Sequence, residues 1–145
     1  MTLIFKILIV AICQNALADG SVLGRWKTID DKTQKPKSVI EIISSGSGLK
    51  GRIVELINPA HKDPRCEKCQ GEQKDQSIVG LEILSGFKSE EGGQKWTDGE
   101  VLDPENGKTY KCRLRLKDEG KSLEVRGYVG ISIFGRSQTW VREGN

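Results

Sequence analysis

The chain has 145 residues, of which 36% are hydrophobic and 30% charged, with a formal net charge of +3. A chain of this length forms one domain that buries about two-thirds of its surface on folding, so it needs no dense disulfide framework. Because the lysines and arginines are interspersed with acids, the composition excludes an extended nucleic-acid footprint, and no nucleic-acid partner is predicted.

Residues 1–18 have the pattern of a cleavable signal peptide. Lys6 provides a positive charge, an apolar run ending at Cys13 follows, and Ala16-Leu17-Ala18 offers the small residues that signal peptidase reads. The apolar run falls short of the roughly 20 residues that span a bilayer, so no stable membrane insertion is predicted. Cleavage before Asp19 is expected. A retained anchor and lipoprotein processing at Cys13 are the alternatives.

The remaining residues, 19–145, are expected to form a single β-barrel domain that is periplasmic or secreted. Eight segments of this domain carry strand patterns. These segments are Val22–Ile29, Ser38–Ser44, Leu49–Ile57, Ser77–Leu84, Glu100–Leu102, Thr109–Lys117, Ser122–Val129 and Arg136–Arg142.

The segment Thr109–Lys117 has the clearest pattern, because apolar residues and Cys112 alternate with lysines and arginines. Such alternation buries one face of a strand and leaves the other in water. Short glycine-containing turns join most of the segments, which makes neighbouring strands antiparallel. In the turn Asp103–Gly107, the Asp103 side chain is expected to cap its own backbone. The predicted fold class is therefore all-β.

Glycines within the strand segments favour closure of the sheet over a two-sheet sandwich. They occur at Gly51, Gly80, Gly127 and Gly130. Closure needs bends and bulges that a residue without Cβ tolerates. We therefore predict an up-and-down antiparallel eight-stranded barrel.

Gly24-Arg25-Trp26, at the start of the first strand, resembles the Gly-x-Trp signature of lipocalins. That resemblance implies that Trp26 closes one end of the barrel and that an arginine on a late strand packs over the indole. Arg142 and Arg136 are the candidates, with Arg142 preferred. Such a cation–π contact contributes about 0.5–2 kcal/mol.

A longer set of motifs, in a fixed order from about Leu23 to Arg142, resembles the family of small secreted bacterial proteins catalogued as domain of unknown function 2147. The motifs are Gly24-Arg25-Trp26, Ile78-Val79-Gly80-Leu81, residues 102–112 (LDPENGKTYKC), residues 123–128 (LEVRGY) and residues 135–140 (GRSQTW). The resemblance implies a lipocalin-like barrel in a Gram-negative periplasm. It implies no reaction and no catalytic residues.

Three cysteines remain after removal of the signal. Cys66 and Cys69 lie in a polar stretch, Asn58–Gln76, and a disulfide between them is the preferred interpretation in an oxidising compartment. Pairing either with Cys112 would close a longer loop and contribute about 4 kcal/mol instead of about 2. Alternation argues against that link, since it places Cys112 on the buried face as a small hydrophobe.

Redox chemistry and zinc binding are the alternatives for these cysteines. No helix follows Cys69, whereas a helix N-terminus lowers the thiol pKa in thioredoxin-type enzymes. His61, Cys66, Cys69 and Cys112 are residue types that zinc binds, but the spacing of a zinc ribbon is absent. No metal site is predicted.

Residues suited to catalysis are scarce. His61 is the only histidine and lies among charged residues, and no nucleophile elbow, His-Glu-x-x-His or phosphate loop is present. We predict no catalytic residues, no cofactor and no enzymatic activity.

The function expected of this chain is binding of a small apolar or amphipathic ligand inside the barrel. An eight-stranded barrel is just wide enough to be filled by side chains or to hold one small ligand. The predicted ligand-binding residues are Tyr110, Leu114, Leu116, Leu123, Val125, Ile40 and Ile42. The alternative is an envelope interaction or structural protein with a filled barrel, acting through Tyr128, Phe134 and the Asn58–Gln76 loop. The protein partner it would have is not predicted.

Overall fold

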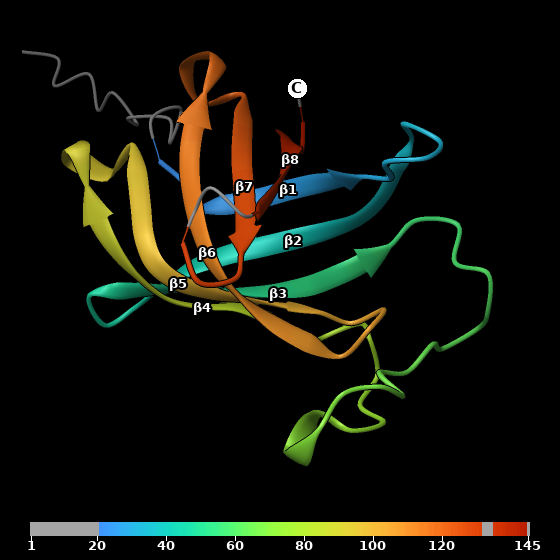
Figure 1. Ribbon diagram of the computed structural model, residues 1–145. Coiled ribbons are helices and arrows are strands. Elements are labelled where there is room, and N and C mark those ends of the chain that lie inside the picture. Colours follow the sequence, from blue (N-terminus) through green and yellow to red (C-terminus); the bar gives the residue numbers. More distant parts are fainter. Residues whose placement is uncertain (1–20, 132–134, 145) are drawn as a thin grey trace, which may run out of the picture.

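The computed structural model describes residues 21–131 and 135–144 as a closed antiparallel barrel (Figure 1). Each strand pairs with the next, and β8 returns to pair with β1. The strands are β1 (Gly24–Ile29), β2 (Pro36–Ser45), β3 (Gly48–Leu56), β4 (Glu82–Glu90), β5 (Lys95–Asp103), β6 (Lys108–Lys117), β7 (Ser122–Tyr128) and β8 (Gly135–Arg142). The predicted all-β, eight-stranded up-and-down barrel is confirmed. The predicted signal peptide and Phe134 lie outside the described residues.

The fourth and fifth strands differ from the sequence prediction. β4 was expected at Ser77–Leu84 and occupies Glu82–Glu90, and β5 begins at Lys95 instead of Glu100. Gly86 and Phe87 within β4 have positive φ angles of 84° and 75°. These angles interrupt the alternation, and the far half of the hairpin is polar, so a period-two pattern is not visible there.

The up-and-down topology gives the barrel two distinct ends. At the loop end lie the β1–β2, β3–β4, β5–β6 and β7–β8 connections, including the long segment 57–81. At the other end, which we call the tryptophan end, lie the first described residues and the three short turns that follow β2, β4 and β6. Short 3-10 helices occupy Gly71–Gln73, Glu91–Gly93 and Asp118–Gly120.

Trp26 is buried at the tryptophan end. Its side chain has no exposed surface, and its Nε1 donates a hydrogen bond to the Val22 carbonyl at 2.9 Å. The guanidinium carbon of Arg142 lies 4.2 Å from the ring centroid. Arg142 also donates Nε to the Gly120 carbonyl at 2.7 Å and Nη1 to the Leu23 carbonyl at 3.1 Å. One arginine therefore joins the first strand, the last strand and the β6–β7 turn.

Inward-facing side chains from all parts of the sheet fill the barrel above Trp26. The most buried of them are Ile40, Ile42, Leu49, Leu84, Leu114 and Leu123, with Trp140 beside them. Two glycines allow the side chains of the core to pack this closely. A Cβ on Gly51 would lie 2.8 Å from Leu84 Cδ1, and one on Gly99 would lie 2.2 Å from Phe87 Cε1. Side chains from β4 occupy the space that these glycines leave.

Within residues 21–131 and 135–144, no helix is both long and apolar enough to cross a membrane.

The buried position of Trp26 predicts a large stability cost for its removal. Trp26→Ala should lower the free energy of unfolding by about 3–5 kcal/mol, because it leaves a cavity and removes the surface on which Arg142 stacks. Ile43→Ala is the control, since Ile43 is 48% exposed, and its effect should stay within about 0.5 kcal/mol. Urea unfolding followed by circular dichroism measures both. A Trp26→Ala loss as small as that of the control would contradict the assignment.

Candidate functional site

The predicted ligand-binding residues divide into two groups in the structure. Six of them are buried in the packed core with Trp26 and Trp140. These are Ile40, Ile42, Leu114, Leu116, Leu123 and Val125, each at most 8% exposed. Tyr110 is only half-buried and lies near the loop end, two residues from the start of β6. The structure therefore does not bring all seven to one open space.

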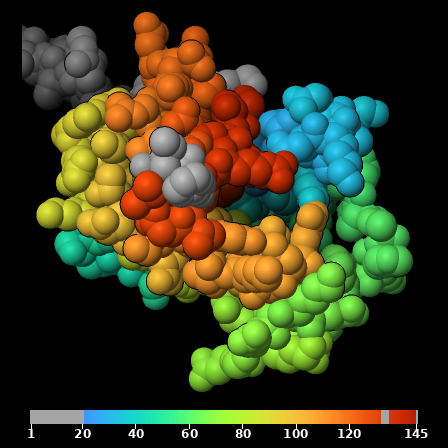
Figure 2. All heavy atoms as spheres, in the orientation of Figure 1, coloured from blue at the N-terminus to red at the C-terminus, as the bar shows by residue number. Residues whose placement is uncertain are grey.

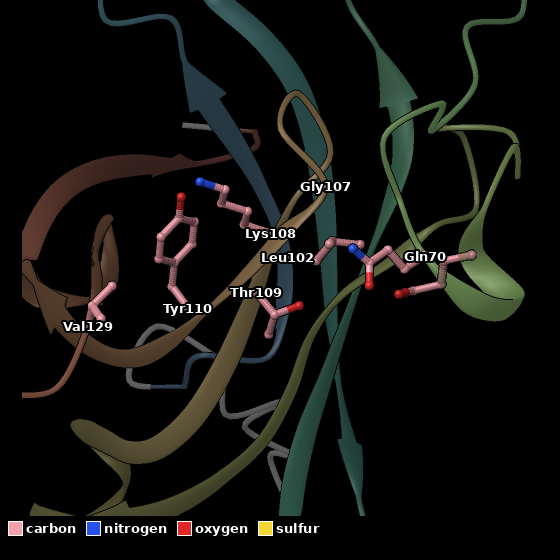
Figure 3. A pocket seen from close by; sticks show the side chains of 8 residues that line it. Gln70, Leu102, Gly107, Lys108, Thr109, Tyr110 and Val129 are labelled. Atoms are coloured by element: carbon pink, nitrogen blue, oxygen red, sulfur yellow. The ribbon is translucent and has the colours of Figure 1, made fainter.

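A hollow of about 530 Å³ lies at the loop end and is open to solvent (Figure 3). It is lined by Gln70, Gln73, Leu102, Gly107, Lys108, Thr109, Tyr110 and Val129. The hollow follows the end of the β5–β6 hairpin, with Tyr110 and Val129 on one side and Gln70 on the other. Its volume lies in the range of ligand sites, which is about 300–1,000 Å³.

The lining combines apolar surface with a few polar groups. Leu102, Val129 and the Tyr110 ring supply the apolar part, while Gln70 and Gln73 supply amides. Lys108 adds an exposed ammonium group beside them. Such a lining suits a molecule with an apolar body and a polar or anionic head.

The β5–β6 turn that carries this lining is held by its own side chains. Asp103 accepts a hydrogen bond from the Glu105 N–H at 2.9 Å, as expected for a turn cap. Asn106 accepts from the Lys108 N–H at 2.8 Å and donates its amide to the Tyr110 hydroxyl at 2.9 Å. The Tyr110 hydroxyl therefore accepts one bond and can still donate its own proton.

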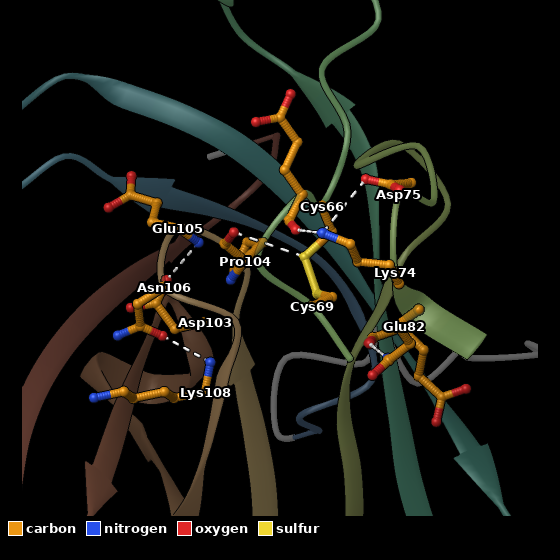
Figure 4. The surroundings of a disulfide bond; sticks show 12 residues. Cys66, Cys69, Lys74, Asp75, Glu82, Asp103, Pro104, Glu105, Asn106 and Lys108 are labelled. Atoms are coloured by element: carbon orange, nitrogen blue, oxygen red, sulfur yellow. Dashed lines mark hydrogen bonds and ion pairs between the residues drawn. A yellow bond between two sulfur atoms is a disulfide. The ribbon is translucent and has the colours of Figure 1, made fainter. Parts of the chain in front are cut away.

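Cys66 and Cys69 form a disulfide in the long β3–β4 connection (Figure 4). Both cysteines are almost fully buried, and the Cys66 sulfur lies 3.7 Å from the Pro104 carbonyl oxygen. A Cβ on Gly107 would lie only 1.8 Å from the Lys68 carbonyl oxygen. The disulfide segment therefore packs directly on the β5–β6 turn, as the adjoining green and orange surfaces in Figure 2 show.

The long connection, expected to be irregular from Asn58 to Gln76, is ordered by its own hydrogen bonds. Arg65 and Ser77 form an isolated β-bridge, and the Ile78 N–H donates to the Pro64 carbonyl at 2.9 Å. The Asp63 carboxylate accepts from Arg65 at 2.8 Å and from Ser77 at 3.0 Å. These two bonds hold the pKa of Asp63 below its usual value. The connection is therefore folded, and its Cys66 and Cys69 belong to the same buried hydrophobic cluster as Leu102 of β5.

Cys112 is a free thiol in the barrel core with no exposed surface. Its neighbours across the sheet are Gly99 and Gly127. Burial raises the pKa of the Cys112 thiol to about 12, so it remains protonated. The longer disulfide that was considered for Cys112 is not formed, since Cys66 pairs with Cys69.

The four residues considered for zinc are not gathered at one place. His61 is exposed in the long connection, Cys66 and Cys69 are joined to each other, and Cys112 lies in the core. In the part of the chain that the structure describes, no three His, Cys, Asp or Glu side chains are grouped to hold a metal ion.

The closed antiparallel barrel of eight strands, with a tryptophan and an arginine at one end, defines a lipocalin-like protein. The chain belongs to the family described as "Uncharacterized protein conserved in bacteria (DUF2147)", whose model matches residues 24–142. The resemblance drawn from the motifs is thus confirmed.

A solved structure is similar to this barrel over most of its length. Protein HP1028 from the human pathogen Helicobacter pylori, described as belonging to the lipocalin family, superposes with a TM-score of 0.74 and 19% sequence identity. The similarity covers 86% of this chain and 84% of that one. At this identity the likeness shows the fold. No curated protein matches the chain in sequence.

Several residues of the hollow could not be assigned to it individually from the sequence. Gln70 and Gln73 reach it only because the disulfide segment packs on Gly107, a contact between positions far apart in the chain. Lys108 and Val129 lie next to turns, and no sequence pattern distinguishes them from other exposed residues. The sequence did indicate this region in three ways: the alternation that nominated Tyr110, the turn motif around Asn106-Gly107, and the long Asn58–Gln76 loop.

The contact at Gly107 predicts that this glycine anchors the disulfide segment. Gly107→Ala should destabilise the protein by roughly 1–3 kcal/mol more than Gly92→Ala, because the new methyl group overlaps the Lys68 carbonyl. Gly92 is the control because its φ angle of 65° is close to the 73° of Gly107. A Cβ added at Gly92 would have no atom within 4 Å. Urea unfolding gives the stability, and trypsin cleavage within residues 57–81 should accelerate in Gly107→Ala alone. Equal effects in the two variants would contradict the contact.

The burial of Cys112 predicts an unreactive thiol. At pH 8 its alkylation by iodoacetamide should be roughly 10³-fold slower than that of an unfolded control, because the thiolate is the reactive form. Peptide mass mapping separates Cys112 from Cys13. Since the pKa is raised from 9.0, the protonated thiol contributes its full stability below pH 9.0 and loses it as pH rises towards 12. Rapid native labelling would contradict the assignment.

Proposed function

We propose that this chain is an exported, non-enzymatic barrel protein that binds a small apolar or amphipathic ligand at the loop end. The observation that carries the proposal is the position of Tyr110. It faces the same side of β6 as the core residue Cys112, yet it is only half-buried and lines the hollow. Tyr110 is therefore where the interior of the barrel meets open space.

Because the core towards the tryptophan end is filled, the space for a ligand lies at the loop end. Leu114 and Leu123, which are deeper in the barrel, have no exposed surface and contact the tryptophan-end core. A ligand at the loop end would lay its apolar part against Tyr110 and Val129 and its head near Lys108. This arrangement favours an amphipathic ligand with an anionic head, of which a fatty acid is the simplest example.

Export is proposed on the signal-peptide pattern of residues 1–18 and on the disulfide. Cys66 and Cys69 are joined, and disulfides persist in oxidising compartments such as the periplasm.

The second candidate is a filled barrel without a ligand, which acts through its outer surface. The dense packing around Trp26 and the two interlocking glycines, Gly51 and Gly99, favours it.

Native mass spectrometry of protein produced in an exporting host tests the main proposal. We expect a chain that begins at Asp19, carries one disulfide and releases a defined small molecule on denaturation. A chain of full length would overturn export.

Binding of the fluorescent fatty acid cis-parinaric acid tests the position of the site. Tyr110→Ala should weaken binding about tenfold or more, equivalent to at least about 1.4 kcal/mol, because the ring and hydroxyl at the rim are lost. Tyr128→Ala is the matched control, since Tyr128 is a half-buried tyrosine on the outer side of β7, and its affinity should equal that of the unmodified chain. Leu114→Ala should instead lower stability by about 2–5 kcal/mol. Absence of binding, or equal affinity in Tyr110→Ala, would favour the filled barrel.

A further inference from the structure

A second hollow adjoins the first one along the disulfide segment. It has a volume of about 560 Å³, is open to solvent, and shares Gln70 and Gln73 with the first hollow. Glu82 also belongs to it and lies on the opposite side of the disulfide from the β5–β6 turn (Figure 4). Its volume is within the range of ligand sites. The residues that line the second hollow are Gln70, Glu72, Gln73, Gln76, Gly80 and Glu82.

The lining of the second hollow is entirely polar. It consists of three amides, two carboxylates and a glycine, so it offers no apolar side chain to a ligand. It also contains no lysine or arginine that would hold an anionic group. The first hollow differs in both respects, because Leu102 and Val129 line it together with the ammonium group of Lys108. The two hollows therefore suit chemically different parts of a ligand.

Hydrogen bonds within the long connection hold the second hollow in shape. The Lys74 N–H donates to the Gly71 carbonyl and the Gln76 N–H donates to the Gln73 carbonyl, both at 3.2 Å. The Gln73 amide donates to the Glu82 carbonyl at 3.2 Å and so joins the two sides of the hollow. The hollow is therefore part of the folded connection.

Gly80 lines the hollow where the chain approaches β4. Its φ angle is 96°, a conformation that favours glycine, and its N–H donates to the Ile53 carbonyl at 2.6 Å. A Cβ added there would have no atom within 4 Å, so the backbone conformation and not a close neighbour favours glycine here. Gly80 belongs to the motif Ile78-Val79-Gly80-Leu81, for which the ligand site at Tyr110 provides no role.

Most hydrogen-bonding groups of this lining are not used within the protein. The Gln73 amide uses one N–H. Glutamine amides donate and accept, and carboxylates accept. Together they complement hydroxyl groups, each of which also donates and accepts. Across residues 21–131 and 135–144, the lining side chains that form no hydrogen bond or ion pair are Gln70, Glu72, Gln76 and Glu82.

The cations nearest to the hollow have partners of their own. Arg52 lies opposite Glu82 on the neighbouring strand β3, and its guanidinium contacts Glu41 at 3.2 Å. Lys74 donates to the Glu67 carbonyl and lies near the Asp75 carboxylate. Binding of an uncharged ligand does not depend on the balance of these charges, whereas binding of a cation would.

We propose that the second hollow is a subsite for a hydroxyl-rich group, such as the sugar head of an amphipathic ligand. The apolar chain of that ligand would lie in the first hollow against Leu102 and Val129, so this part rests on the function proposed above. Gln70 and Gln73 would contact both parts, because they line both hollows. The sugar would lie on the Gln70 side of the first hollow, opposite Lys108 (Figure 3).

Two detergents with the same dodecyl chain test this subsite, both used below the concentrations at which they form micelles. Dodecyl maltoside has a sugar head, and dodecyldimethylamine oxide has a small head without hydroxyl groups. The protein, produced in an exporting host and verified by intact mass, should bind the maltoside at least about tenfold more tightly, which corresponds to one or two additional hydrogen bonds. Displacement of cis-parinaric acid measures both affinities. Equal affinities would overturn the subsite.

Substitutions that affect only the second hollow identify the residues responsible. Gln76→Ala/Glu82→Ala should remove most of the preference for the maltoside, because both side chains line the second hollow and neither lines the first. Gln34→Ala/Glu100→Ala is the matched control, since both side chains are exposed and lie outside the two hollows. Its preference should stay within about twofold of that of the unmodified protein. Circular dichroism verifies that both variants are folded. An unchanged preference in Gln76→Ala/Glu82→Ala, or an equal loss in the control, would overturn the assignment.

Two further titrations separate failure of the subsite from failure of the proposed function. Absence of cis-parinaric acid binding would contradict the proposed function, and calorimetric titration with maltose then tests the second hollow by itself. Maltose binding that is lost in Gln76→Ala/Glu82→Ala would support the subsite, and absence of maltose binding in that case would overturn it. Competition by spermidine, a cation without hydroxyl groups, would identify a cation site and would overturn the sugar assignment.

Discussion

Closure of this barrel depends on the contact between Trp26 and Arg142. β8 and β1 pair through only two residue pairs, Trp26 with Arg142 and Lys27 with Val141, so the sheet is weakest where it closes. The Arg142 side chain reinforces that seam, because it stacks on the indole and donates to backbone carbonyls from the first strand region and the β6–β7 turn. Loss of this contact would therefore weaken the seam by which the sheet avoids two exposed edges.

The filled tryptophan end determines where the protein can interact with other molecules. Side chains packed above Trp26 leave little unoccupied space in the lower barrel, and the glycines at Gly51 and Gly99 are used to admit neighbouring side chains. The ligand site that we propose therefore lies at the loop end. There the disulfide segment, the β5–β6 turn and the end of β7 meet, and the contact at Gly107 keeps the first two together.

The hollow at Tyr110 combines apolar and amide groups in a concave surface at the loop end. A ligand held there would need no opening of the packed core, because the hollow lies at the rim.

Local patterns in the sequence determined most of the architecture. The alternation in Thr109–Lys117, the turn residues and the Gly-x-Trp motif predicted an eight-stranded barrel closed by Trp26, because each of these signals depends on neighbours in the chain. The capping role of Asp103 followed from the same local chemistry. The predicted position of β4 was wrong, because positive φ angles at Gly86 and Phe87 interrupt the alternation of side chains there.

Only the tertiary structure decided which inward-facing residues fill the core and which line a site. Alternation assigns Tyr110 and Leu114 to the same face, yet the depth of each in the barrel, and so its exposure, depends on the side chains that other strands contribute. The requirement for glycine at position 107 likewise arises from the Lys68 carbonyl, which lies far away in sequence. The opposition of Arg113 and Arg126 depends on strand register, which a single strand does not encode.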